Sequence, residues 1–81
     1  MPHFFFDTYD GIRHVKDDVG QDLDTIEAAK AEALKALPDM AREEISQDSH
    51  RTTVVSVRDE SGNVVLRAAL SLIVEEGTLD D

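Results

Sequence analysis

The segment from residue 64 to residue 75 carries an apolar residue at every second position. These residues are Val64, Leu66, Ala68, Leu70, Leu72 and Val74. Successive side chains of a β-strand point to opposite faces of a sheet, so a period of two is typical of a strand with one buried face. The segment therefore predicts a strand whose even-numbered side chains pack against a covering layer.

The residues from 24 to 45 are predicted to form that layer as a helix. Their apolar residues recur at spacings of three to five, as on one stripe of a helix. The stripe consists of Ile26, Ala29, Ala33, Leu37, Met40 or Ala41, and Ile45. Asp24, followed by Glu27 three residues later, is the predicted N-cap. Pro38 lacks an amide hydrogen, so we expect one bent helix ending near Ile45, with a break at Pro38 as the alternative.

Two hairpins are predicted to flank the helix. The pair Asp10-Gly11 follows an aromatic run and predicts a turn between strands over residues 3–8 and 12–16. A two-residue turn there would place Asp7 opposite His14. The stretch "ESGN" at residues 60–63 lies between two strand-like segments and predicts the second hairpin.

Together these elements predict an α+β fold of two layers, in the order ββαββ. We expect a four-stranded, mainly antiparallel sheet with one helix packed on one face. We expect a single domain over residues 1–81. The polar connector "SQDSHRT" at residues 46–52 is expected to be mobile, and the acidic tail at residues 76–81 is expected to be frayed.

Three stretches, in this order, carry a family resemblance: "HFFFDTYDG", "DDVGQDLDTIEAAKAEAL" and "VVSVRDESGNVVLRAALSLIVE". They resemble a family of small bacterial proteins known only as a domain of unknown function. Its members share an aromatic start followed by Asp, a D-x-x-G before the helix, an alanine-rich helix and a V-R-D-E-x-G turn. Pro38 departs from such a helix. The resemblance spans nearly the whole chain and implies the fold, but it implies no activity and no functional residue.

The charge of the chain limits its partners. Eighteen acidic and eight basic residues give a net charge of −10, which repels nucleic acid and anionic membranes. Basic or neutral protein partners are favoured instead. The sequence has no cysteine and no apolar run of the roughly 18 residues that span a membrane. We therefore expect a cytoplasmic protein that binds neither nucleic acid nor membrane.

No motif predicts a catalytic, cofactor or metal site. In "DDVGQDLD", placing Gly20 at the sixth position of a calcium loop leaves Asp17 as the one carboxylate on the first three ligand positions. The three histidines are scattered, whereas a zinc site needs three or four converging ligands. The serines near His50 lack the turn and the oxyanion donors of a nucleophile.

One apolar surface remains for a functional role. A helix on one face leaves the other face of the sheet open, and exposed apolar patches typically mark interfaces. The predicted interface residues are Phe5, Tyr9, Ile12, Val65, Ala69 and Ile73, with Val54 as an additional candidate. We therefore predict a non-enzymatic, acidic interaction module that forms a homodimer through this face. The alternatives are an antitoxin-like neutraliser of a basic protein, and a small-molecule-binding or catalytic domain that uses Asp7, His14 and the acidic loop.

Overall fold

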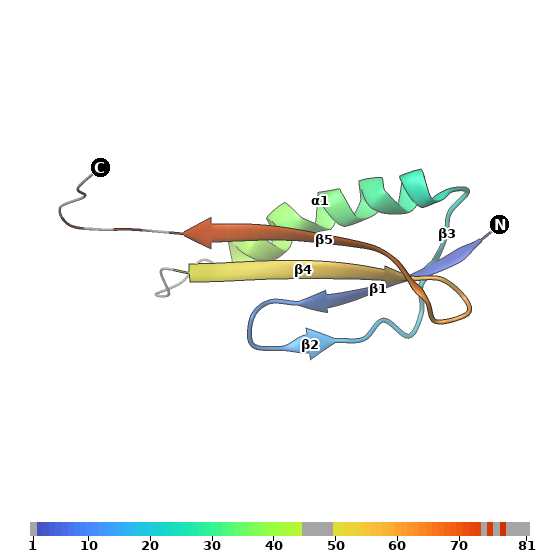
Figure 1. The fold of residues 1–81 in the computed structure, drawn as a ribbon, viewed down its shortest axis with the longest axis horizontal. Coiled ribbons are helices and arrows are strands. Elements are labelled where there is room, and N and C mark those ends of the chain that lie inside the picture. Colours follow the sequence, from blue (N-terminus) through green and yellow to red (C-terminus); the bar gives the residue numbers. More distant parts are fainter. Residues whose placement is uncertain (1, 45–49, 74, 76, 78–81) are drawn as a thin grey trace.

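The computed structural model describes residues 2–44, 50–73, 75 and 77. The chain forms two layers, in which one helix lies along one face of an antiparallel sheet (Figure 1). The elements are β1 (His3–Tyr9), β2 (His14–Val15), β3 (Gln21–Asp22), α1 (Ile26–Glu44), β4 (His50–Arg58) and β5 (Val64–Ile73). The predicted α+β fold is confirmed.

The sheet has the order β2-β1-β4-β5, and the short β3 pairs with the start of β1. The first strand of the chain therefore lies beside the first strand after the helix, with Phe6 opposite Val57 and Thr8 opposite Val55. The predicted second hairpin joins β4 to β5. The Asp59 carboxylate closes its turn by accepting hydrogen bonds from the amides of Ser61 and Asn63, both at 2.9 Å.

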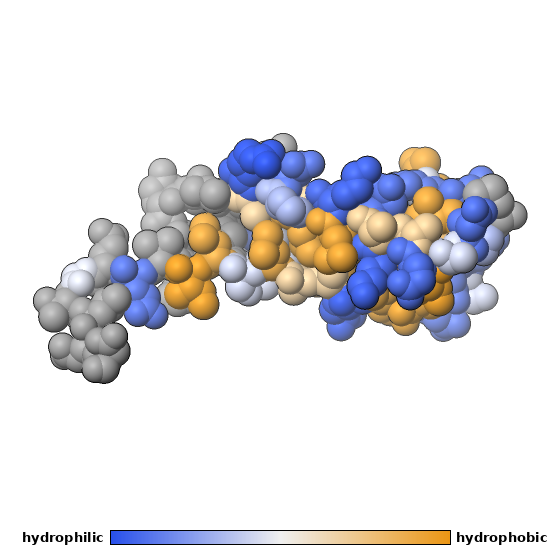
Figure 2. All heavy atoms as spheres, turned by 90° about the horizontal axis from the view of Figure 1, so that it is seen from above, coloured by the Kyte–Doolittle hydropathy of each residue, from blue (hydrophilic) through white to orange (hydrophobic). Residues whose placement is uncertain are grey.

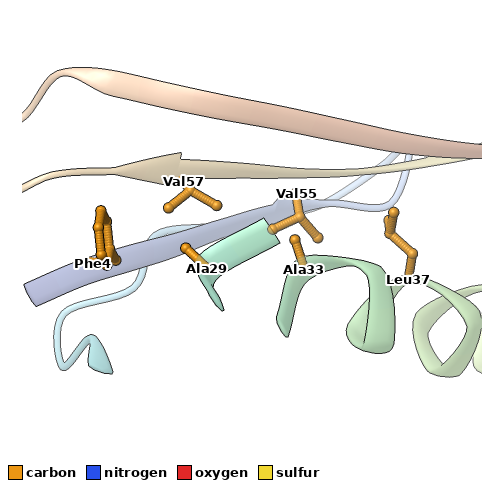
Figure 3. Close-up of a cluster of buried hydrophobic side chains, with 6 residues drawn as sticks. All are labelled: Phe4, Ala29, Ala33, Leu37, Val55 and Val57. Carbon is orange, nitrogen blue, oxygen red and sulfur yellow. The ribbon is translucent and has the colours of Figure 1, made fainter. Parts of the chain in front are cut away.

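The core lies between α1 and the sheet, with α1 packed on β4 and β5. It consists of Phe4, Ala29, Ala33, Leu37, Val55 and Val57 (Figure 3). Ala29 and Ala33 point from α1 toward Val57 and Val55, and their small size lets the helix approach the sheet closely. Each buried valine contributes about 1.5–3 kcal/mol relative to an exposed one. The predicted helix stripe is confirmed at its centre.

The helix begins one residue later than predicted. The Thr25 hydroxyl accepts a hydrogen bond from the Ala28 amide at 3.1 Å, as an N-cap side chain does. Asp24 is exposed and is not the cap. The reason lies in the preceding residue, because the Leu23 amide donates to the Pro2 carbonyl at 3.0 Å and extends the pairing of β3 with β1. The chain is thus held against the sheet until Leu23 and turns into the helix only afterwards.

α1 continues through Pro38 to Glu44 as one helix. The prediction of one helix is therefore confirmed over the described residues, and the alternative of a break at Pro38 is wrong. Part of the predicted connector is wrong, because residues 50–52 belong to β4. Residues 45–49, which include the predicted helix end at residue 45, lie outside the described part of the chain, as does the predicted frayed tail apart from residue 77.

The first hairpin differs from its prediction. Tyr9 lies opposite His14, so four residues separate the paired strands and the predicted two-residue turn is wrong. The Asp10 carboxylate holds the wider loop by accepting hydrogen bonds from the Ile12 amide at 2.9 Å and the Arg13 amide at 2.7 Å. Such side-chain capping of following amides stabilises a loop that a two-residue turn would not contain.

The pairing of β4 with β5 contains a register shift near the start of β5. Val57 lies opposite Leu66 and Arg58 lies opposite Val64, so Val65 is an extra residue, as in a β-bulge. Val65 and Leu66 both pack against the core cluster, whereas Val64 is 51% exposed. The prediction that Val65 lies on the open face is therefore wrong, because simple alternation does not hold across a bulge.

Candidate functional site

The face of the sheet turned away from α1 carries rows of residues that cross β1, β4 and β5. Val55 and Val57 point into the core, so their neighbours in β4 point to the opposite, open face. One row consists of Asp7, Ser56 and Arg67, and the next consists of Tyr9, Val54 and Ala69. The half of the open face that carries Asp7 and Arg67 is polar, and we name it the polar half. The other half carries the apolar row, followed along β4 and β5 by Thr52 and Ser71, whose hydroxyl oxygens lie 3.0 Å apart.

An ion pair dominates the polar half. The Arg58 guanidinium binds both carboxylate oxygens of Asp7, with Nε–Oδ2 at 2.6 Å and Nη2–Oδ1 at 3.1 Å. Asp7 is buried, and the guanidinium carbon lies 4.9 Å from the centre of the Phe5 ring. Hydrogen bonds from Arg58 lower the pKa of Asp7, and the same contact raises the pKa of Arg58. The pair is desolvated, bidentate and stacked on an aromatic ring, which is the favourable geometry for arginine.

Asp17 fastens the acidic loop over this ion pair. Its amide donates to Asp7 Oδ1 at 2.9 Å, and its carbonyl accepts from Arg58 Nη2 at 3.0 Å. Its carboxylate accepts from the amide of Phe6 at 3.0 Å, which lies in β1 between the parts paired with β2 and β3. The carboxylate therefore takes the place of a strand at this point of the sheet edge.

The same carboxylate also shapes the loop itself. It accepts hydrogen bonds from the amides of Val19 at 2.9 Å and Gly20 at 3.1 Å. Burial raises the pKa of Asp17, but the hydrogen bonds from three backbone amides together lower the pKa below its usual value. In the stretch that was compared with a calcium loop, the Asp17 carboxylate thus accepts hydrogen bonds from backbone amides.

His3 holds the far end of the loop. Its Nδ1 lies 2.6 Å from Asp22 Oδ1, and its Nε2 lies 2.7 Å from the Val19 carbonyl oxygen. Both partners only accept hydrogen bonds, so both ring nitrogens donate when the imidazole is protonated. The hydrogen bond to Asp22 is the main cause that raises the pKa of His3, and the Val19 carbonyl adds to it. The same contact lowers the pKa of Asp22.

The observed contacts of Asp7 differ from those expected for a small-molecule-binding or catalytic domain. Asp7 was predicted to face His14, but Arg58 and the Asp17 amide occupy its oxygens, and His14 lies opposite Tyr9. Within the described ranges, no group of three or more histidine, aspartate or glutamate side chains could hold a metal ion. Sequence reasoning missed Arg58. The signal available was a single charged residue at the end of an apolar strand.

The predicted interface residues are distributed over different surroundings. Tyr9, Ala69 and the additional candidate Val54 lie in one row, and Ile73 lies at the end of β5. Phe5 lies under Arg58, Ile12 is in the loop between β1 and β2, and Val65 is against the core. The structure brings Tyr9, Val54 and Ala69 together in one row, and Ile73 lies further along β5 on the same face, beyond Ser71. We name these four residues the apolar end: Tyr9, Val54, Ala69 and Ile73.

A comparison with protein-family models finds one matching family. The family model described as Domain of unknown function (DUF6894) matches residues 3–71. The chain belongs to this family. The match begins with β1 and ends inside β5, so the DUF6894 domain includes the loop network and most of the open face. The description of the family assigns no function.

Other comparisons add little. No curated protein and no solved structure matches the chain. Among the described residues, no helix is both long and apolar enough to cross a membrane.

Proposed function

We propose that the protein is an acidic interaction module rather than an enzyme, and that it self-associates through the apolar end of its open face. The observation that carries the proposal is the row formed by Tyr9, Val54 and Ala69 across three strands. Ile73 lies on the same face, beyond the paired Thr52 and Ser71. Tyr9 is 41% exposed and Ile73 is 59% exposed. Uncovered apolar side chains gathered on one surface are typical of contact sites between proteins.

The polar half of the open face supports this role by its rigidity. Asp7, Asp17 and Arg58 bind each other, and their hydrogen bonds reach the backbone of the loop at residues 16–20. A general base or a ligand-binding carboxylate needs an oxygen that can be offered to a substrate. These carboxylates serve the fold instead, which leaves the apolar end as the surface best suited to binding.

The net charge determines how such contacts respond to salt. Two copies with a charge of −10 each repel one another at long range, whereas their apolar ends attract only on contact. Added salt screens the repulsion and should strengthen self-association. A basic partner, as an antitoxin-like neutraliser would have, should show the opposite salt dependence.

Sedimentation velocity at high micromolar concentration tests the proposal. The wild type should sediment as a dimer, more completely in 0.5 M than in 0.05 M sodium chloride. Ile73→Lys should shift it toward the monomer, because a charge in an apolar contact must either be desolvated or keep the surfaces apart. Val15→Lys is the matched control, since Val15 is also exposed but lies opposite Thr8, which is on the same side of β1 as Phe4 and Phe6 and therefore on the helix side of the sheet.

The results that contradict the proposal are equally direct. A wild type that stays monomeric in both salts would overturn self-association. Equal loss of the dimer in Ile73→Lys and Val15→Lys would place the contact away from the apolar end. Far-ultraviolet circular dichroism of both variants should match the wild type, because both positions are exposed.

A further inference from the structure

The outer strand β5 presents an unusually plain edge. In the described part of the chain, β5 pairs with β4 alone, over Val64–Ile73. The opposite edge is formed by two-residue strands, β2 and β3, which pair with β1. Long exposed edges are normally protected by charges, prolines or bulges. Arg67 is the one charged residue in this strand, no proline is present, and the bulge lies at its start.

The apolar surface continues around this edge. α1 packs on β4 and β5, so the helix lies beside the edge rather than over the middle of the sheet. Figure 2 views the molecule from the side of α1 and β5 and shows hydrophobic groups along the long axis between hydrophilic ones. Leu70, in β5, and Leu34, in α1, are both large exposed hydrophobic residues.

We infer that two copies of this chain pair antiparallel through β5, with Ala69 opposite Ala69 of the second copy, to form one continuous sheet. This inference rests on the proposed self-association and narrows its contact to the β5 edge, where Ala69 and Ile73 of the apolar end lie, whereas Val54 lies one strand away in β4. A two-fold axis perpendicular to the sheet keeps both helices on the same face and makes the contact self-complementary.

The sequence of β5 favours this register over its neighbours. Directly opposed residues of an antiparallel pair share a face, so the axis must pass through a residue rather than between two. An axis at Arg67 would oppose two like charges, which is destabilising. An axis at Ala68 or at Leu70 would place Arg67 opposite an apolar residue. Of these four registers, an axis at Ala69 is the one that gives Arg67 a polar partner, Ser71 of the second copy.

The contacts of Arg67 within one chain are compatible with the Ala69 register. Arg67 Nε already donates to the Ser56 hydroxyl at 3.0 Å, across the β4–β5 pair. Ser71 of the second copy would flank the same guanidinium from the other side. On the helix face, Leu66 would oppose Leu72 and Ala68 would oppose Leu70. The apolar row of Tyr9, Val54 and Ala69 would continue without interruption into the row of the second copy.

Disulfide trapping tests the inference, because the natural sequence contains no cysteine. In Ala69→Cys, directly opposed residues would have Cα atoms about 4.5–5.5 Å apart, which suits a disulfide. In the control Ser71→Cys, the two new residues would be offset by four positions, or about 13 Å. Under a glutathione redox buffer, Ala69→Cys should give at least tenfold more linked dimer on a non-reducing gel. Reduced Ala69→Cys should sediment like the wild type.

A second variant separates this contact from a dimer in which two open faces stack. Stacked sheets lie about 10 Å apart, which is too far for a disulfide at residue 69. Val54→Lys places a charge in the centre of the open face and would break a stacked dimer, but it should leave edge pairing intact. A dimeric wild type with no trapping of Ala69→Cys, or with loss of the dimer in Val54→Lys, would overturn edge pairing and leave self-association standing. A monomeric wild type would overturn both.

Discussion

Gly20 lies in the acidic loop directly against His3 and Phe4 of β1, and its replacement by alanine measures how tightly the loop is held. Its φ is +75°, a left-handed conformation that costs a residue with a Cβ about 1–2 kcal/mol. A Cβ built there would lie 2.6 Å from His3 Nε2 and 2.7 Å from the Phe4 carbonyl oxygen. The Phe4 backbone is fixed by its pairing with Gln21, so the crowding cannot be relieved by a small local shift.

Two free-energy terms therefore add in Gly20→Ala. Forcing extra atoms into a closely packed place typically costs about 1–3 kcal/mol, in addition to the backbone term. We expect the free energy of unfolding to fall by about 2–5 kcal/mol. A domain of this size has a total stability of roughly 4–12 kcal/mol. The substitution should therefore lower the urea midpoint substantially.

Gly62→Ala is the matched control for this experiment. Gly62 has a similar φ of +89°, but nothing lies within 4 Å of a Cβ built on it. It should lose only the backbone term of about 1–2 kcal/mol. Urea unfolding followed by circular dichroism should thus separate the two variants by at least about 1 kcal/mol. Equal destabilisation would refute the argument that the loop is packed tightly against β1.

Two further outcomes follow from the polar half of the open face. Asp7→Asn should lower the free energy of unfolding by about 1.5–3 kcal/mol, because the bidentate bond to Arg58 loses the negative charge of the carboxylate. The control Asp18→Asn, at an exposed residue, should change the free energy of unfolding by less than about 0.5 kcal/mol. Similar values for the two variants would count against a stabilising role of the Asp7–Arg58 ion pair. The pKa of His3 is raised in the folded state, so its contribution is fully present below its unfolded pKa of about 6.5 and is lost as pH rises through the folded pKa. The stability difference between wild type and His3→Gln should therefore shrink from pH 5.5 to pH 9, and a constant difference would exclude a protonated His3 as its source.

Local patterns predicted those parts of the structure that depend on neighbouring residues. The period of two in β5 and the stripe of Ala29, Ala33 and Leu37 in α1 both follow from which side of an element meets the core. The turn of the second hairpin followed from its polar, glycine-containing sequence. One covering layer and two hairpins then limited the fold to few arrangements.

The rest depends on contacts between distant residues or on single side chains. Arg58 and Asp7 are 51 residues apart, and no local pattern connects them. Val65 lies on the core side instead of the predicted open face, because β5 has one extra residue at the bulge and a strict period of two does not predict a bulge. The first hairpin widened because the Asp10 carboxylate caps two amides. In each case one polar contact or one residue of register outweighed the average pattern.

The position of β1 in the sheet has a consequence for the time course of folding. β1 is the first strand of the chain, yet its partner β4 ends at Arg58, which lies opposite Phe5. Closing a loop of about 50 residues costs about 2 kcal/mol more in chain entropy than closing one of about 5 residues, as in the β4–β5 hairpin. During synthesis, β1 leaves the ribosome early and must wait for β4, while α1 and the later hairpin form from local contacts. The rate at which the sheet is completed is therefore set by this one long-range pairing, between two strands that lie on either side of α1 in the sequence.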